Sequence, residues 1–420
     1  MASLARSLQR RGHQCEFFFF HRGAMEEYLP PECPVSFGDM ADCLELVRAR
    51  KYDIVHANSG DWNYGIPTVR LVGAQLVITA HGMVVEGWNS TNCDGFTTVS
   101  QWQADKQGNF TDLPIHVIYN GLDIQKFRPP ASLEADGSAP IVAWVGRGID
   151  MVHKRIDRLA AIAPALRQAG YRIWIADPYG PDEVEKVVPD AAGVLREHAE
   201  FWDGIDREKL PEFYRAVASS GGCILSTSVR EGFGLVLAEA QACGCPAIGP
   251  DVVGVNEVVR PANGGVIYEP DITPEALVTL ITTTLNDSAR LRVRRQQAVE
   301  FAQPEFDLEK MVSAYEQVYK QVLTTRQPTL RQQLRNWLAP ITSWNTYVAH
   351  RWSAGRAQYD LSRELQQRGE DRLASAVMKT SFATCPTQFA KPDRLINLFR
   401  TIITAPFSGS PRSRDNESVL

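Results

Sequence analysis

The sequence lacks any apolar run that approaches the roughly 18 residues of a membrane-spanning helix. Its run of phenylalanines, Phe17–Phe20, is far too short for such a span. The N-terminus also lacks the charged and then apolar pattern of a signal peptide. Hydrophobic residues make up 44% of the chain and charged residues 22%, which is close to average usage. Together these features favour a soluble globular protein.

Metal-binding and redox spacings are scarce as well. The cysteines include no CxxC pair, the histidines include no HxxxH pair, and no group of aspartates resembles a metal site. We therefore expect reduced thiols, a cytoplasmic location and no protein-bound catalytic metal. Cys243 and Cys245 allow a metal or redox pair, but we favour small side chains packed beside a helix.

The net charge of −5 conceals an uneven distribution. Residues 325–420 hold 14 Lys/Arg and 7 Asp/Glu, whereas the remainder holds 30 and 42. We interpret 325–405 as a basic helical extension and 406–420 as a disordered polar tail. The extension interleaves aromatic residues with arginines. This is typical of a helical appendage packed on the body, which we favour, or of a peripheral contact with the inner face of a membrane. We expect no nucleic-acid partner.

Short apolar strands alternate with helices through the first 323 residues, which predicts an α/β fold with mainly parallel sheets. The expected strands are Cys15–Phe20, Asp53–Ala57, Gln75–Thr79, Gly95–Val99, His116–Tyr119, Ile141–Val145, Tyr171–Ala176, Cys223–Ser228, Cys245–Gly249 and Gly265–Tyr268. The expected helices are Met1–Arg11, Asp39–Arg50, Arg155–Gln168, Asp206–Ser219, Leu235–Cys243, Thr273–Leu285, Leu308–Leu323, Leu330–Leu338 and Ser343–Met378. Ligands of such sheets bind at the carboxyl ends of the strands.

A stretch rich in proline and small residues, 129–140, has the composition of a linker. It separates an N-terminal unit, 1–128, from a second unit, 141–324, and a cleft between two such units is a common ligand site. The first unit opens with a helix, whereas an open α/β unit normally opens with a strand and a loop. We therefore expect the N-terminal strand to be missing and the first unit to be truncated.

The most informative stretch spans residues 230–257. An apolar strand leads into a glycine turn, Gly232-Phe233-Gly234, and a helix follows from Leu235. A turn of this kind presents backbone N–H groups to a phosphate. Glu239 lies roughly 7 Å along the helix from the turn, about the span from a diphosphate to a ribose, and Glu231 lies on the other side. Because carboxylates accept paired hydrogen bonds from vicinal hydroxyls, the stretch suits a nucleotide-sugar.

Two cations and a histidine complete the candidate site. Arg147 follows a strand and Lys154 precedes a helix, so the pair could neutralise a diphosphate leaving group, although loop cations are more often solvated. His81 ends a strand of the first unit and could hydrogen-bond a sugar hydroxyl or a phosphate oxygen, with a structural role equally open. Asn120 and Ser228 follow strands and are further cleft candidates, but Asn120 also fits a plain Asn-Gly turn.

Taken together, these residues resemble the retaining GT-B-fold glycosyltransferases of family four, the group 1 glycosyl transferases. The resemblance spans roughly residues 1–323, and the Glu-x7-Glu element with its glycines is its most specific part. The matching motifs are Thr79-Ala-His81-Gly, Thr98-Val-Ser100, Val117-Ile-Tyr-Asn120-Gly-Leu-Asp123 with Phe127, Val145-Gly-Arg147 with Lys154, Ser228 with Glu231-Gly-Phe-Gly-Leu and Glu239-Ala-Gln-Ala-Cys-Gly, and Gly254 with Glu257. Val236 stands where the family often has proline, and His153-Lys154-Arg155 replaces a common Lys-Gly pair.

The resemblance implies two Rossmann-like domains facing a cleft, and it implies roles for the candidate residues. Arg147 and Lys154 would grip the donor diphosphate, and Glu239 would hold the ribose. Glu231, with the backbone of Gly232–Leu235, would contact the donor sugar and phosphate, while His81 would approach the sugar from the acceptor side. The family moves a sugar from a nucleotide-sugar, here a UDP- or GDP-sugar, to a glycan or lipid-linked acceptor with retention and without metal.

The function implied by the resemblance is a transfer step in polysaccharide or glycolipid biosynthesis. Two alternatives remain open at this point. A shortened family member could bind nucleotide-sugars or partners without full turnover, and a GT-B-fold nucleotide-sugar epimerase would carry a similar donor site.

Overall fold

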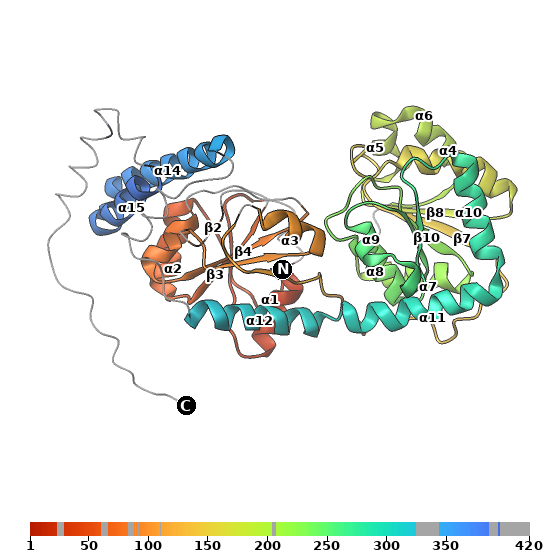
Figure 1. Ribbon diagram of the computed structural model, residues 1–420, viewed down its shortest axis with the longest axis horizontal. Coiled ribbons are helices and arrows are strands. Elements are labelled where there is room, and N and C mark those ends of the chain that lie inside the picture. The colour runs from red at the N-terminus through yellow and green to blue at the C-terminus, as the bar shows by residue number, and fades with distance from the viewer. Residues whose placement is uncertain are drawn as a thin grey trace.

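A computed structural model of the chain describes residues 1–22, 29–59, 66–82, 88, 90, 92–109, 111–203, 207–324, 344–385 and 394. It consists of two α/β units lying side by side, with a pair of helices attached to the outer side of the first unit (Figure 1). The expected helix Leu330–Leu338 and the expected tail 406–420 lie outside the described residues.

The first unit contains a parallel sheet with the strand order β3-β4-β5-β6 and a separate parallel pair, β1-β2. The strands are β1 Phe17–Phe19, β2 Val35–Phe37, β3 Ile54–Ser59, β4 Gln75–Ala80, β5 Gly95–Thr98 and β6 Ile115–Val117. The helices are α1 Ala2–Arg10, α2 Met40–Arg50, the 3₁₀ helix η2 Ile66–Val72 and α3 Gln101–Gln107. All the strands expected here are present with small shifts at their ends, whereas β2 was not foreseen.

The second unit is a six-stranded parallel sheet in the order β12-β11-β10-β7-β8-β9. Its strands are β7 Ile141–Val145, β8 Arg172–Asp177, β9 Glu200–Asp203, β10 Cys223–Leu225, β11 Ala247–Pro250 and β12 Val266–Tyr268. Its helices are α4 Ile156–Gln168, α5 Gly180–Val187, α6 Pro189–His198, α7 Leu210–Ser219, α8 Leu235–Ala242, α9 Val255–Val258, α10 Pro274–Asn286 and α11 Ser288–Glu305, with 3₁₀ turns η3 Arg207–Lys209 and η4 Pro261–Asn263. The strand order reverses between β7 and β10, and this switch point is where doubly wound sheets bind ligands.

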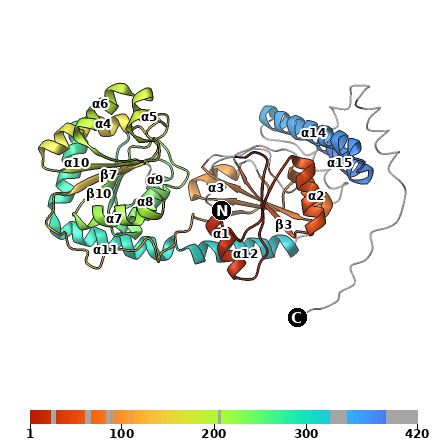
Figure 2. The same cartoon turned by 180° about the vertical axis from the view of Figure 1, so that it is seen from behind.

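Helix α12, Leu308–Thr324, returns from the second unit to the first and runs beneath its sheet (Figures 1 and 2). Its apolar face, with Val312 and Val318, packs on Val77 of β4 and on Leu4 of α1. The sequence placed this helix in the second unit, because an amphipathic pattern predicts a helix but does not say which sheet it covers.

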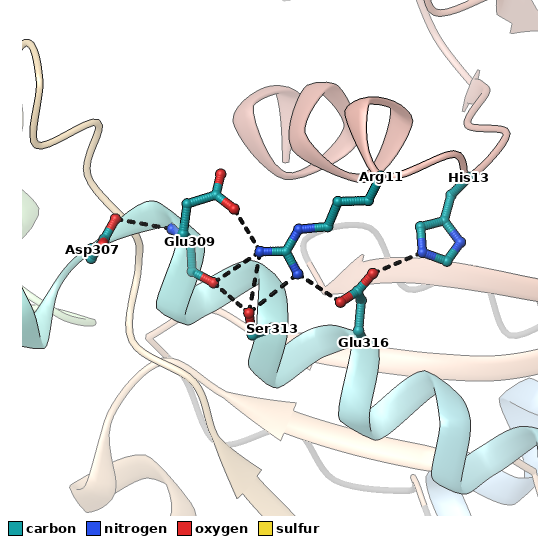
Figure 3. A network of polar contacts seen from close by, with 6 residues as sticks. All are labelled: Arg11, His13, Asp307, Glu309, Ser313 and Glu316. Atoms are coloured by element: carbon teal, nitrogen blue, oxygen red, sulfur yellow. Dashed lines mark hydrogen bonds and ion pairs between the residues drawn. The ribbon is translucent and has the colours of Figure 1, made fainter.

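Polar contacts fasten α1 to the exposed side of α12 (Figure 3). The Arg11 guanidinium lies between Glu309 and Glu316, at 2.5 and 2.6 Å, and also donates to the Ser313 hydroxyl. His13 Nε2 lies 2.8 Å from Oε1 of Glu316. Although desolvation opposes it, the hydrogen bond from His13 leads the contacts that hold the pKa of Glu316 below its usual value. These contacts therefore join the start of the first unit to α12, which follows about 300 residues later in the chain.

The C-terminal helices α14, Trp344–Gln367, and α15, Asp371–Thr384, form a hairpin that packs on α2 and η2. Leu365 and Val377 are buried against the same core as Leu44. Arg368 pairs with Asp39 and Asp42, at the capped start of α2. The helical extension is thus a packed appendage over these residues. Within the ranges that the structure describes, no helix is long and apolar enough to cross a membrane.

Candidate functional site

The glycine turn lies at the switch point of the second sheet, after β10 and before α8. Gly234 has a left-handed backbone, with φ of 78°, and acts as the N-cap of α8. A side chain there would be strained, so glycine allows the sharp entry into the helix. The turn aims the first amides of α8 toward the end of the sheet where ligands of this fold bind.

Glu231 and Lys154 meet at this point. Lys154 Nζ lies 2.5 Å from Oε1 of Glu231, and the Ser228 hydroxyl donates to the same oxygen at 2.7 Å. The two charged side chains are only 17% and 15% exposed, so water screens the pair less than a surface pair. The structure therefore brings three predicted site residues into direct contact.

Arg147 is held differently. Its guanidinium lies 3.3 Å from Asp150 and is 58% exposed, which leaves it available to a ligand at the end of β7. Asp150 also accepts a hydrogen bond from Nδ1 of His153, and Arg230 donates to Nε2 of that ring. Desolvation opposes these contacts, but the hydrogen bond from His153 holds the pKa of Asp150 below its usual value. Arg147 therefore belongs to a chain of polar contacts next to Lys154.

Glu239 lies inside the second unit with 1% of its surface exposed. The buried Tyr214 hydroxyl donates to its Oε2 at 3.0 Å. Burial, followed by the charge of Glu239, raises the pKa of Tyr214 well above its usual value. The structure does not place Glu239 in contact with Glu231 or Lys154, so its contact with a ribose stays a prediction.

The side chain of Phe233 points into the protein and not toward a ligand. It is 3% exposed, stacks on Tyr119 of the first unit with ring centroids 5.5 Å apart, and meets Phe306 in a T-shaped contact at 5.2 Å. Only the backbone of Phe233 remains for the predicted donor contact. Asn120 follows Tyr119 directly, beside the segment where the chain crosses between units, since Leu122 N–H donates to the carbonyl of Phe306.

His81 and Gly82 of the first unit lie opposite the glycine turn. A Cβ placed on Gly232 would lie 2.8 Å from Cα of Gly82, so the two backbones touch. His81 Nε2 lies 2.8 Å from Oδ1 of Asn58. Although the ring keeps contact with solvent, desolvation by the surrounding protein lowers the pKa of His81 to about 4. A neutral imidazole at neutral pH suits a hydrogen bond to a hydroxyl better than an ion pair with phosphate.

Three further residues shape this site in ways that the sequence did not predict. Asp177, at the end of β8, accepts backbone N–H groups from Gly148 and Tyr179, and thereby fixes the loop that carries Arg147. Arg155 adopts a left-handed backbone, with φ of 47°, which favours glycine over residues with a side chain. Glu257 reaches across to the first unit. Glu257 and Arg155 had a sequence signal, as a motif residue and as a departure from a motif, whereas Asp177 had none.

Among the residues that the structure covers, no three or more His, Cys, Asp or Glu side chains gather as metal ligands. Cys243 and Cys245 are buried and form no disulfide, in agreement with packed thiols. Burial raises the pKa of both thiols.

Comparison with known proteins finds two families in succession along the chain. The family "Glycosyl transferases group 1" matches residues 126–301, and "Glycosyltransferase Family 4" matches residues 1–126. D-inositol 3-phosphate glycosyltransferases of Catenulispora acidiphila and Xylanimonas cellulosilytica are 28% identical over 204 residues and 26% identical over 279 residues. The matches cover 45% and 62% of this chain. They cover 47% and 62% of those proteins, so the chain spans about half to three-fifths of the length of these relatives.

The solved structures agree on the fold. The Anabaena protein HepE, in a crystal structure with UDP and glucose, superposes with a TM-score of 0.60 at 19% identity, covering 76% of this chain and 94% of that one. At this identity the likeness concerns the architecture, which is GT-B.

Proposed function

We propose that this chain, which has the GT-B fold and matches the group 1 glycosyl transferase model over residues 126–301, transfers a sugar from a nucleotide-sugar to a hydroxyl of a glycan or lipid-linked acceptor. The single observation that carries the proposal is the pair Lys154–Glu231 beneath the glycine turn, facing His81 of the other unit. A half-buried cation, a second exposed cation and the amides of a helix start form a site for a diphosphate.

In this proposal Lys154 and Arg147 bind the diphosphate and stabilise the negative charge that grows on it as the sugar leaves. Glu231 orients Lys154 and contacts the sugar, while Glu239 holds the ribose. His81 accepts a hydrogen bond from a sugar hydroxyl. No residue of this set requires a metal ion for its role.

Retention of configuration is part of the proposal. The bond between the anomeric carbon and the diphosphate oxygen breaks, and the acceptor hydroxyl oxygen bonds to the same carbon on the same face. The hydroxyl proton passes to the departing diphosphate, so neither an external base nor a redox partner is needed. The unit 1–128 would supply the acceptor contacts, and 141–305 the donor site.

We favour UDP over GDP as the carrier, because HepE was crystallised with UDP and glucose. The reduced cysteines fit a cytoplasmic enzyme, and the basic extension would bring it to lipid-linked acceptors in polysaccharide or glycolipid synthesis.

A donor-binding experiment tests the proposal. Calorimetric titration of the full chain with UDP-, GDP- and ADP-sugars should find one class that binds, and Lys154→Met should weaken that binding at least about tenfold, since one charged hydrogen bond is lost. Lys186→Met, which removes an exposed lysine of the same unit, should leave it unchanged. If no nucleotide-sugar binds, the proposal fails.

Product analysis then separates the alternatives. Transfer to an acceptor, or slow release of the donor sugar with retained configuration, supports a retaining transferase. Binding without turnover would support the shortened, inactive family member, and an altered free sugar would support an epimerase.

A further inference from the structure

Glu257, on the short helix α9 of the second unit, makes its main contacts with the first unit. Its Oε2 accepts the backbone N–H of Gln101 at 2.8 Å, and its Oε1 accepts that of Trp102 at 2.7 Å. The residue is 9% exposed. One carboxylate therefore spans the two units with both of its oxygens engaged.

The two amides belong to the first turn of α3. The first N–H groups of a helix have no partner within the helix and need one from outside. Within the unit, Ser100 serves as the N-cap and accepts the N–H of Gln103 at 3.3 Å. The amides of Gln101 and Trp102 are left to Glu257, so the second unit completes the cap of a helix in the first. A charged acceptor makes these bonds stronger than neutral ones.

Glu257 is also connected to the glycine turn. The Tyr119 hydroxyl donates to its Oε2 at 3.3 Å, and the Tyr119 ring stacks on Phe233 of the turn. Gly254 is the N-cap of α9, and a Cβ placed on it would lie 2.2 Å from the carbonyl oxygen of Glu231. The α9 start, the turn and Glu257 therefore form one tightly packed body on the second unit.

We infer that Glu257 is a positioning residue that holds the two units closed over the donor. Domains of one chain commonly open and close relative to each other around a ligand. Opening would move the carboxylate away from α3 and leave its two amides to water, and it would separate Gly82 from Gly232. Closing restores all of these contacts at once, which couples the geometry at His81 to that at Glu231. That closure serves donor binding rests on the proposed function, but the contact itself can be tested without it.

Hydrogen exchange tests the contact without donor or acceptor. In Glu257→Ala the amides of Gln101 and Trp102 should exchange at least tenfold faster, which corresponds to about 1.4 kcal/mol. The radius of gyration from small-angle X-ray scattering should rise. Glu257→Gln keeps one oxygen acceptor but no charge, so its exchange rates and radius of gyration should lie between those of the wild type and those of Glu257→Ala. Unchanged exchange and an unchanged radius in Glu257→Ala would overturn the inference.

A matched control separates a loose helix from an open molecule. Ser100→Ala removes the cap from within the first unit, so it should accelerate exchange at Gln103 without changing the radius of gyration. If Ser100→Ala enlarges the molecule as much as Glu257→Ala does, the closing role is refuted.

Donor affinity links the inference to function. Because only closed molecules would bind the donor tightly, the apparent donor Kd of Glu257→Ala should rise by the factor by which the closed fraction falls, with little change in kcat at saturation. An exchange effect in a chain that binds no nucleotide-sugar would support the contact and sink the proposed function. Weaker donor binding in Glu257→Ala with wild-type exchange would support the proposed function and refute the contact.

Discussion

Replacing Gly232 with alanine tests whether the two units must touch for function. In the structure Gly232 and Gly82 face each other with no side chain between them. The alanine Cβ would lie 2.8 Å from Cα and 3.2 Å from N of Gly82, whereas ordinary contacts are 3.4–4 Å. Both neighbours are backbone atoms, which cannot rotate away. The units must therefore separate by at least about 0.6 Å at this point.

The two consequences differ in size. No core side chain is lost and the units can shift as bodies, so the free energy of unfolding should change by less than about 1 kcal/mol. A misplacement approaching 1 Å between reacting groups can cost about a hundredfold in rate. We therefore expect kcat/KM for sugar transfer to fall between about tenfold and a hundredfold in Gly232→Ala, with a nearly unchanged Tm.

The assay pairs steady-state transfer with thermal unfolding, and Gly193→Ala is the control. Gly193 lies in α6, where an added Cβ meets nothing within 4 Å. Because alanine is favoured over glycine within a helix, that variant should gain about 0.5–1 kcal/mol of stability. Its kcat/KM for sugar transfer should stay unchanged. Wild-type kcat/KM in Gly232→Ala would refute the reasoning, and so would a loss that merely follows a large fall in Tm.

Two further predictions concern the backbone and the pH. Arg155→Gly should be more stable than Arg155→Val by about 1–2 kcal/mol in chemical unfolding, because both lose the ion pair with Asp157 but only valine is strained at φ of 47°; equal stabilities would contradict this. Burial lowers the pKa of His56 to about 3, where its ring nitrogens meet Tyr319 and Thr79. The unfolded chain then binds the extra proton between pH 6.5 and 3, so stability should rise with pH across that window by at most about 1.4 kcal/mol per unit. His56→Gln should flatten this slope, and an identical slope in both proteins would count against the assignment.

Local pattern accounts for most of the elements that the sequence predicted. The strand Ile141–Val145 was placed to the residue, because a β-branched apolar run ends there in glycine. Helix α11 was missed, although it is 18 residues long. Its buried face includes Arg295 beside Leu291 and Ala298. The charged residue interrupts the periodic pattern of apolar residues that predicts a helix. Strand β2 has three residues and too little pattern to stand out.

The candidate site was likewise predictable from the sequence only in part. The glycine turn and Lys154 were predictable, because strand, turn and helix follow one another in the sequence. The contact of Gly82 with Gly232 and the reach of Glu257 to α3 were not, since each joins residues about 150 positions apart in different units. The burial of Glu239 depends on Tyr214, a neighbour contributed by another helix.

The return of α12 to the first sheet has a consequence for synthesis on the ribosome. The last strand of that sheet ends at Val117, but the helix that covers Val77 and Ile118 begins only at Leu308. At the usual 5–20 residues per second, the nascent sheet waits roughly 10–40 s with that apolar face uncovered. A fragment that stops near residue 128 would keep the face exposed, and we expect it to aggregate or to be held by chaperones. The first unit is thus synthesised first but completes its fold last, after α12 has emerged.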